Sequence, residues 1–289
     1  MLAHAKDLIK DAFKRSYAVG SFNTFDLEVT QGIVNAANKE NAPVIIMVSE
    51  STIDYAGIKP ITHIVSTIAK NEAIQIPVAL HLDHGKKFHS VVETINAGFT
   101  SVQIDGSDLA LDENIMLTKQ IVDYAHKRNV IVQGEVGRIP GIHATSEKLV
   151  VKRGAPTNVN DAVKFVKQTG VDTLAVSIGN CHGLAAPKLD FGLLKKIRES
   201  LDIPLVLHGG SGTKAEDVKK LVAAGITDIN IDSELRKAFT NKLRETLKAK
   251  PKEFDPRVII APSRQAVSKV VSEKMEIFGA AGKANGGIL

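Results

Sequence analysis

The stretch PVALHLDHG, residues 77–85, begins as an apolar β-strand and ends with two imidazoles and a carboxylate. Its first residues suit a buried strand, whereas His81, Asp83 and His84 crowd its end and Gly85 begins a predicted turn. In barrels of parallel strands the active site gathers at the carboxyl ends of the strands. The stretch therefore suggests a barrel strand that carries catalytic groups at its end.

Seven other short β-branched runs resemble this one, and segments of helical periodicity separate them. The predicted strands are 18–23, 43–49, 77–83, 100–105, 130–136, 172–178, 204–209 and 227–232. Eight strand–helix units predict the α/β class and a (β/α)8 TIM barrel with an additional C-terminal helix, built as a single domain over residues 1–289. An open doubly wound sheet is the competing architecture, but no G-x-G-x-x-G motif follows the first strand.

The amino-acid composition limits the kinds of binding partner that the protein is expected to have. No apolar run in the 289 residues approaches the about 20 residues that span a bilayer, so we expect no membrane association. The net charge of +5 is spread along helices and the chain has no tryptophan, which argues against nucleic acid and suits an anionic small substrate. The N-terminal segment is typical of an amphipathic helix rather than a secretory signal. Together with the single cysteine, Cys181, this predicts a cytoplasmic protein.

Polar or ionisable residues stand at the end of every predicted strand. In chain order they are Asn23, Ser49, Asp83 with His84, Asp105, Glu135, His182, His208, and Asn230 with Asp232. Polar residues would not fall at the same end of eight strands by chance. The pattern therefore indicates an active site at the mouth of the barrel, where the carboxyl ends of the strands meet. Asn23 and Ser49 are candidate substrate contacts within it.

Three histidines, His84, His182 and His208, come from three different strands, and each has a glycine beside it. The glycine allows a sharp turn of the backbone, so that the ring can point inward. Three imidazoles with an open fourth position are a common catalytic zinc site, and neutral imidazole also binds other divalent transition metals. Each histidine alone could equally be a hydrogen-bonded residue at a loop start, but the trio at one face favours a metal site.

Carboxylates accompany the histidines. Asp83 is the candidate general acid/base, because a carboxylate beside a metal can move a proton on a substrate hydroxyl. The alternative is a turn aspartate that caps the following helix. Asp105 and Glu135 could hold a second divalent or monovalent cation, or complete an alternative position for the first.

Two turns are suited to binding an anion, because each places free N–H groups at a helix N-terminus. Gly209, Gly210 and Ser211 follow the seventh strand, and Asn230, Ile231, Asp232 and Ser233 follow the eighth. The loops after these two strands are the usual phosphate site of such barrels. We therefore expect a sugar phosphate as the ligand.

The motifs HLDHG, QIDGS, GEVGRI, SIGNCHG, LHGGSG and INIDSEL occur in this order, followed by DPR at 255–257. Together they resemble the class II, metal-dependent fructose-bisphosphate and tagatose-bisphosphate aldolases along nearly the whole chain. The resemblance implies a catalytic zinc on His84, His182 and His208, Asp83 as acid/base, and an auxiliary cation position lined by Asp105 and Glu135. It also implies that Gly183, the 209–211 turn and residues 230–233 hold dihydroxyacetone phosphate. Arg257 would reach the second phosphate in a neighbouring subunit of a homodimer or homotetramer.

The implied reaction is the reversible zinc-dependent cleavage of fructose 1,6-bisphosphate to dihydroxyacetone phosphate and glyceraldehyde 3-phosphate, a lyase step of glycolysis. Aldol cleavage requires stabilisation of an enediolate beside a carbonyl, which a Lewis-acid metal supplies. The other solution is a Schiff-base lysine inside the barrel, and none of the predicted strands contains a lysine. In the resembling family, an acidic or amide residue at the position of Asp232 is typical of fructose enzymes and alanine of tagatose enzymes.

The sequence departs from the family pattern in three places. The segment LAAPKLDF after CHG is shorter, and Asp26 stands where asparagine or histidine is usual. The loop 138–156 offers Glu147, with His143 as a substitute, where the family has an acidic pair. Three alternatives therefore remain: an aldolase for tagatose 1,6-bisphosphate or another ketose phosphate, a metal-dependent hydrolase, and a non-catalytic barrel that binds sugar phosphate.

Overall fold

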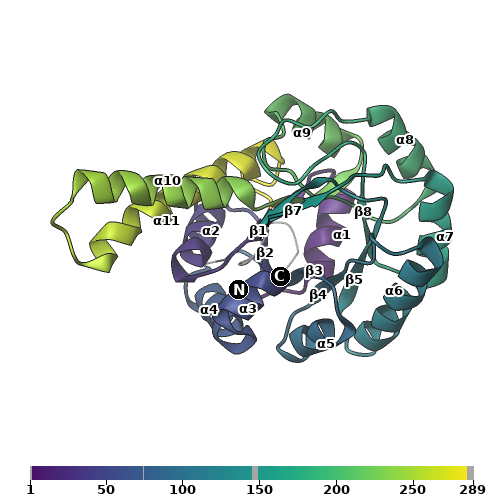
Figure 1. Ribbon diagram of the computed structural model, residues 1–289, viewed down its shortest axis with the longest axis horizontal. Helices are drawn as coiled ribbons and strands as arrows, with labels where there is room; N and C mark the ends of the chain where they lie inside the picture. Colours follow the sequence, from purple (N-terminus) through teal and green to yellow (C-terminus); the bar gives the residue numbers. More distant parts are fainter. Residues whose placement is uncertain (1, 74, 145–148, 285–289) are drawn as a thin grey trace.

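The computed structural model describes residues 2–73, 75–144 and 149–284. Its barrel strands are β1 (Val19–Asn23), β2 (Val44–Ser49), β3 (Val78–Gly85), β4 (Ser101–Ile104), β5 (Ile131–Val136), β8 (Thr173–Val176), β9 (Leu205–Leu207) and β10 (Ile226–Ile231). Parallel pairing closes them in the order β1-β10-β9-β8-β5-β4-β3-β2 (Figure 1). The prediction of a TIM barrel is confirmed, and each predicted strand overlaps an observed one.

Helices surround the barrel and extend beyond it (Figure 1). They are α1 (Ala5–Arg15), α2 (Leu27–Glu40), α3 (Glu50–Ala56), α4 (Ile58–Asn71), α5 (Phe88–Asn96), α6 (Leu111–His126), α7 (Val159–Thr169), α8 (Phe191–Ser200), α9 (Ala215–Ala223), α10 (Ser233–Ala249) and α11 (Pro256–Ile277). The last of them is the additional C-terminal helix expected from the sequence. No helix within the described ranges combines the length and apolarity needed to cross a membrane.

Helix α1 covers the amino-terminal end of the barrel. The amide of Ala3 donates to the carbonyl of Val78 at the start of β3 (2.9 Å), and Leu8 and Ile9 of α1 are buried. Burying this apolar face stabilises the closed end of the barrel. The carboxyl ends of the strands consequently remain available for a site.

The pairing register brings the strand ends to one level. Ser49 at the end of β2 lies opposite Asp83 on β3, and Ser21 on β1 lies opposite Asn230 on β10. Because side chains alternate along a strand, Asp83 and Asn230 can both point into the same end of the barrel. Strands β3 and β10, which are far apart in sequence, thus contribute to one mouth.

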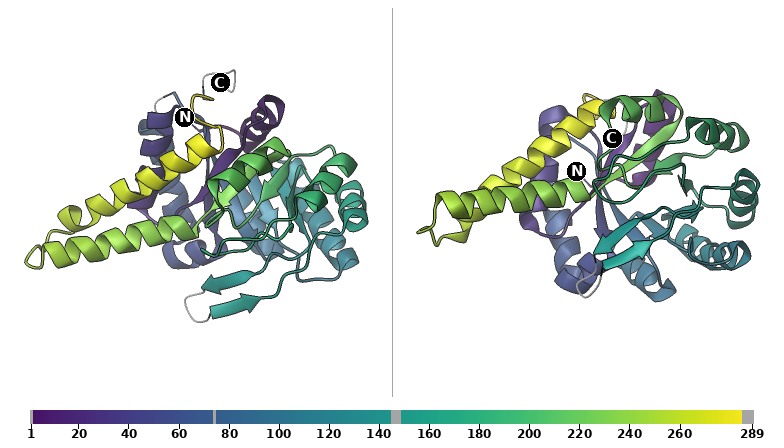
Figure 2. Two further views of the ribbon diagram at one scale, coloured as in Figure 1. Left: turned by 90° about the horizontal axis from the view of Figure 1, so that it is seen from above. Right: turned by 45° about the horizontal axis from the view of Figure 1, so that its top comes forward.

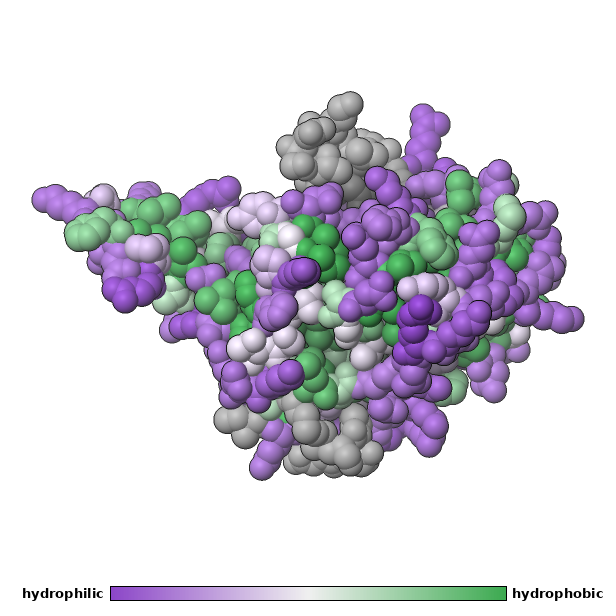
Figure 3. All heavy atoms as spheres, turned by 90° about the horizontal axis from the view of Figure 1, so that it is seen from below, coloured by the Kyte–Doolittle hydropathy of each residue, from purple (hydrophilic) through white to green (hydrophobic). Residues whose placement is uncertain are grey.

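Helices α10 and α11 form a long antiparallel arm that projects from the barrel (Figures 1 and 2). The arm exposes large apolar side chains, among which Phe254 is 90% exposed and Leu247 is 47% exposed. Figure 3 shows apolar side chains on this arm, away from the bulk of the molecule. Such exposed apolar groups mark a candidate contact surface.

A two-stranded antiparallel hairpin, which the predicted strands do not include, lies within the 138–156 loop. Its strands are β6 (Gly141–Ala144) and β7 (Leu149–Lys152), and it projects from the barrel (Figure 2). Gly141 bridges to His182, and a side chain at Gly141 would collide with the Cβ of that histidine. The hairpin is therefore anchored directly to the predicted mouth.

Candidate active site

The end of β3 is shaped by an unusual backbone conformation at His84. This residue has φ of 51°, in the left-handed region that non-glycine residues rarely occupy. Gly85, which was predicted to make the turn, remains in the strand without a positive φ. Its role is close packing, since a Cβ there would lie 2.6 Å from the carbonyl oxygen of Gln103. The turn therefore occurs at His84 itself, one residue earlier than the glycine suggested.

The other two histidines reach the mouth by different routes. His208 follows β9 directly, whereas β8 ends at Val176 and His182 lies in the loop beyond it. Gly209 has φ of 67°, and a Cβ there would collide with the carbonyl oxygen of Cys181. The two loops thus pack backbone against backbone, which brings the rings of His182 and His208 into the same mouth.

The three imidazoles converge on one point. Ring centroids are 4.7 Å apart for His84 and His208, 5.1 Å for His84 and His182, and 6.1 Å for His182 and His208. One ligand nitrogen from each lies within 4.8 Å of the others. The 3.0 Å between His84 Nε2 and His208 Nδ1 is close to the about 3.3 Å expected of two nitrogens on a tetrahedral zinc. These residues fit a divalent transition metal.

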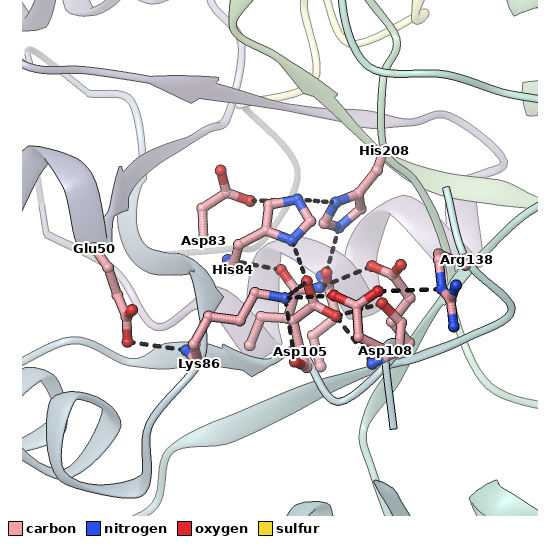
Figure 4. A network of polar contacts seen from close by, with 12 residues as sticks. Glu50, Asp83, His84, Lys86, Asp105, Asp108, Arg138 and His208 are labelled. Carbon is pink, nitrogen blue, oxygen red and sulfur yellow. Dashed lines mark hydrogen bonds and ion pairs between the residues drawn. The ribbon is translucent and has the colours of Figure 1, made fainter. Parts of the chain in front are cut away.

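Hydrogen-bond acceptors beside His84 and His208 determine which nitrogen of each ring carries a proton. His84 Nδ1 lies 2.8 Å from Asp105 Oδ2, and His208 Nε2 lies 2.7 Å from Gln133 Oε1 (Figure 4). Each contact places a proton on the outer nitrogen, because a carboxylate or amide oxygen can only accept. The inner nitrogens, His84 Nε2 and His208 Nδ1, then face each other across the metal position.

His84 and His208 differ in their affinity for a proton. Burial lowers the pKa of His84, but Asp83 and Asp105 outweigh it and raise this pKa to about 9. Burial and the neighbouring His84 and His182 hold the pKa of His208 well below its usual range. A proton on His84 Nε2 can therefore be shared with His208 Nδ1. A metal ion needs the unprotonated nitrogen of His84, so metal affinity should fall as the pH falls.

Asp83 points into the same mouth and is 8% exposed. Its Oδ2 accepts a hydrogen bond from Asn23 Nδ2 (2.9 Å), and Oδ1 lies 3.9 Å from His84 Nε2. It does not cap the following helix: the N-cap of α5 is Lys87, without a side-chain cap bond. The capping alternative is thus excluded, and the carboxylate is held beside the metal position by the amide of Asn23.

Asp105 and Glu135 lie deeper, below His84. Their ligand oxygens and a nitrogen of His84 lie within 4.8 Å of one another, and Glu135 is 1% exposed. Gln103 connects the group, because its Nε2 donates to Glu135 Oε2 (3.2 Å) and its Oε1 accepts from the amide of His84 (2.9 Å). The structure thus brings both predicted carboxylates to the mouth.

The two predicted phosphate turns are joined to each other. The amide of Gly210 donates to the carbonyl of Asn230 (3.0 Å), and Ser211 Oγ accepts from the amide of Glu234 (3.3 Å). Helix α10 begins directly behind them, and its N-cap residue Asp232 makes no cap bond. The N–H groups of the first turn of α10 therefore face the same region as the 209–211 turn, as an anion site requires.

A buried ion pair that the sequence did not predict supports these turns. Glu234 Oε1 accepts from the amide of Gly212 (2.8 Å), and Lys274 of α11 lies 2.7 Å from Glu234 Oε2. Lys274 is 9% exposed, so the pair is largely shielded from water. No local pattern in the sequence indicated this pair, because Lys274 is remote from Glu234 along the chain.

The remaining residues that were predicted to contact the substrate lie in different parts of the structure. Gly183 follows His182 with φ of 109°, and Ser49 caps α3 by accepting from the amide of Thr52 (3.3 Å). Ile231 is buried in the core, which leaves only its backbone for a ligand. Arg257 lies in the first turn of α11, ion-paired with Asp255 (2.8 Å), and this helix belongs to the arm that projects away from the barrel (Figure 1).

Two departures from the family pattern can be placed. Asp26 caps α2, with its side chain accepting from the amide of Val29 (2.7 Å). Among the loop residues, the backbone of His143 lies in β6, and Glu147 lies outside the described residues.

Asp228, on β10 beneath Asp83, gives a prediction about stability. It is buried and accepts from Ser21 Oγ (2.5 Å), and burial, reinforced by Asp83, raises its pKa from 3.8 to about 7. Because the folded chain holds this proton more tightly than the unfolded chain, Asp228 lowers stability as the pH rises from about 4 to 7. Asp228→Asn should therefore raise the free energy of unfolding at pH 8 by about 2–4 kcal/mol.

The gain should shrink towards pH 4, where the parent carboxyl is protonated in both states. Denaturant unfolding of both proteins at pH 4.5 and 8, in the same metal state, measures it. Asp54→Asn, an exposed carboxylate on α3, is the control and should change neither value. A gain of equal size at both pH values would show that Asp228 does not titrate as described.

Comparison with known proteins agrees with this geometry. A sequence model described as fructose-bisphosphate aldolase class-II matches residues 3–283. The chain is 42% identical to a fructose-bisphosphate aldolase of Geobacillus stearothermophilus, covering 98% of this chain and 99% of the relative. It is 39% identical to the 6-phospho-5-dehydro-2-deoxy-D-gluconate aldolase of Bacillus subtilis, covering 96% of each.

Among solved structures, the YdjI aldolase from Escherichia coli K12 superimposes with a TM-score of 0.85 at 31% identity, covering 99% of this chain and 100% of that one. Fold, arrangement of histidines and sequence similarity thus lead to one conclusion. The chain belongs to the class II fructose-bisphosphate aldolase family.

Proposed function

We propose that the protein catalyses the reversible, zinc-dependent cleavage of fructose 1,6-bisphosphate to dihydroxyacetone phosphate and glyceraldehyde 3-phosphate. The observation that carries this proposal is the convergence of His84, His182 and His208 within 4.8 Å, beside the carboxylate of Asp83. A metal bound there would supply Lewis-acid stabilisation of the negative charge that develops next to the substrate carbonyl. Of the barrel strands, all of which are described, none contains a lysine for the Schiff-base alternative.

Asp83 would move the proton in this reaction. In the cleavage direction its carboxylate takes the proton of the substrate hydroxyl whose carbon becomes the aldehyde, and in synthesis it returns that proton. Asn23 keeps the carboxylate oriented toward the mouth through its 2.9 Å hydrogen bond. Asp83 and the metal ligand His84 are adjacent in sequence, so the turn at His84 positions both.

The phosphate of the dihydroxyacetone phosphate portion would bind between the 209–211 turn, Gly183 and the start of α10. Backbone N–H groups and Ser233 at a helix N-terminus provide donors for an anion. Glu234 and Lys274 hold this region to α11 and thereby fix the distance between phosphate and metal. Such positioning of a remote substrate group contributes directly to the rate.

Other sugar phosphates are the second candidates, together with tagatose 1,6-bisphosphate. One relative is named for 6-phospho-5-dehydro-2-deoxy-D-gluconate, which by its name carries a single phosphate. A kcat/KM comparison of the zinc-loaded chain on all three sugars, with unphosphorylated fructose as control, tests the proposal. We expect the highest value for fructose 1,6-bisphosphate. Binding of dihydroxyacetone phosphate without turnover of any sugar would instead indicate a non-catalytic barrel.

Asp232 is the proposed discriminator between fructose and tagatose bisphosphates, which differ in the configuration of the C4 hydroxyl. Arg236 Nε donates to Asp232 Oδ1 (2.6 Å) and holds the carboxylate at the rim of the mouth. A hydroxyl in the wrong configuration leaves acceptor positions unpaired, which costs roughly 1–3 kcal/mol, or about 5- to 150-fold in specificity. We expect Asp232→Ala to lose most of the preference for fructose 1,6-bisphosphate.

The measurement is kcat/KM for both epimers in the parent, Asp232→Ala and Asp232→Asn. Asparagine keeps an acceptor oxygen and should preserve part of the preference. An unchanged ratio in Asp232→Ala would show that another group discriminates.

We further propose a cytoplasmic homodimer or homotetramer. The exposed apolar groups of the α10–α11 arm support self-association, and Arg257 near its tip would then meet the second phosphate in a neighbouring subunit. Size-exclusion chromatography with light scattering tests the assembly.

A further inference from the structure

The carboxylate of Asp105 is fully engaged within the chain. Its Oδ1 accepts from the amide (3.1 Å) and the hydroxyl (2.6 Å) of Ser107, and its Oδ2 contacts His84 Nδ1 (2.8 Å) and Lys86 Nζ (2.6 Å). The side chain is 1% exposed. An ionised carboxylate offers about four acceptor positions, so these four donors use all of them. A cation could bind Asp105 only by displacing a donor.

The side chain of Lys86 is 42% exposed, but contacts fix both its backbone amide and its ammonium (Figure 4). Its backbone amide donates to Glu50 Oε1 (2.9 Å), which fixes the start of the loop after β3. Its ammonium lies 2.6 Å from Asp105 and 3.7 Å from Asp108, and Asp108 in turn pairs with Arg138 (3.1 Å). A buried carboxylate requires such a positive partner, because its isolated charge would be costly to bury.

We infer that the ammonium of Lys86 is the resident cation of Asp105, so that the group formed by His84, Asp105 and Glu135 takes no second metal ion. Asp105 then acts on the proposed catalytic metal only through His84: it accepts the Nδ1 proton and leaves Nε2 directed at the metal position. A divalent ion placed beside the ammonium would be repelled by it. The inference rests on the proposed metal site, yet it concerns a separate position and fails separately.

Metal stoichiometry tests the inference without using activity. The full chain is stripped with a chelator, saturated with Zn²⁺, desalted and analysed for bound zinc per chain. We expect Lys86→Met to bind about one ion more per chain than the parent, because the released Asp105 oxygen joins Glu135 as a ligand. Lys86→Arg keeps the charge and Lys87→Met removes the neighbouring lysine, so both should bind as many ions as the parent.

The His208→Ala background isolates the second position. His208 belongs to the histidine trio and is absent from the group of His84, Asp105 and Glu135, so Lys86→Met/His208→Ala should bind about one ion more than His208→Ala alone. Circular dichroism checks that each variant is folded. If Lys86→Met does not fold, Lys86→Gln takes its place in the comparison. Equal stoichiometry of parent and charge-removed variant would overturn the inference. A parent that binds no zinc would instead contradict the proposed catalytic site, and the gain on removal of Lys86 would still be measured.

Discussion

Replacing His208 with alanine is expected to abolish both zinc binding and aldol cleavage. The ring lies 3.0 Å from His84 Nε2 and is held by Gln133, so it is a fixed member of the histidine group. Two remaining imidazoles do not fix the geometry of a site with three protein ligands. Loss of the Lewis acid removes several kcal/mol of stabilisation, which corresponds to at least about a thousandfold in kcat.

The matched control for this variant is His89→Ala. His89 lies on α5 with its side chain 80% exposed, and its loss should change neither zinc content nor rate. Zinc per chain is measured on the same samples as the triose phosphate released. A His208→Ala protein with parental activity would remove the histidine trio from the proposed mechanism.

The second large effect is expected for Asp83→Ala, which should separate proton transfer from metal binding. Asp83 Oδ1 lies 3.9 Å from His84 Nε2 and contributes no ligand atom to the histidine group. The variant should therefore keep its zinc and its affinity for dihydroxyacetone phosphate. Its kcat should fall at least about a hundredfold, the lower range for a positioned acid/base.

Zinc content, binding of dihydroxyacetone phosphate and kcat are measured on the same preparation. Asp54→Ala, a surface substitution on α3, serves as the control and should match the parent in all three. If Asp83→Ala lost its metal together with its rate, the carboxylate would have a structural role in the site and the assignment as acid/base would be wrong.

The barrel could be predicted from sequence because its signals are local. Each strand is a short β-branched run, and the alternation with helical segments specifies parallel pairing without knowledge of distant contacts. The β6–β7 hairpin was missed for the opposite reason. Its strands have only four residues each and are stable through pairing with each other and with His182.

The residues of the candidate site likewise include some that could be predicted from the sequence and some that could not. Residues at strand ends, such as Asp83 and His208, could be placed at the mouth from their position alone. His182 was predicted to stand at the end of a strand, but β8 ends at Val176 and His182 lies in the loop beyond it. The partners of these groups were not predictable: Lys86 meets Asp105, and Lys274 meets Glu234, through contacts that exist only once the barrel has closed.

Release of triose phosphate from fructose 1,6-bisphosphate by the full chain, followed in a coupled assay during zinc titration of the metal-stripped protein, tests the proposed zinc-dependent cleavage most directly. We expect no activity without metal and a rate that rises in proportion to zinc until about one ion per chain is bound. Full activity after exhaustive chelation would contradict this expectation, and so would a zinc-saturated protein that binds dihydroxyacetone phosphate but releases no triose phosphate.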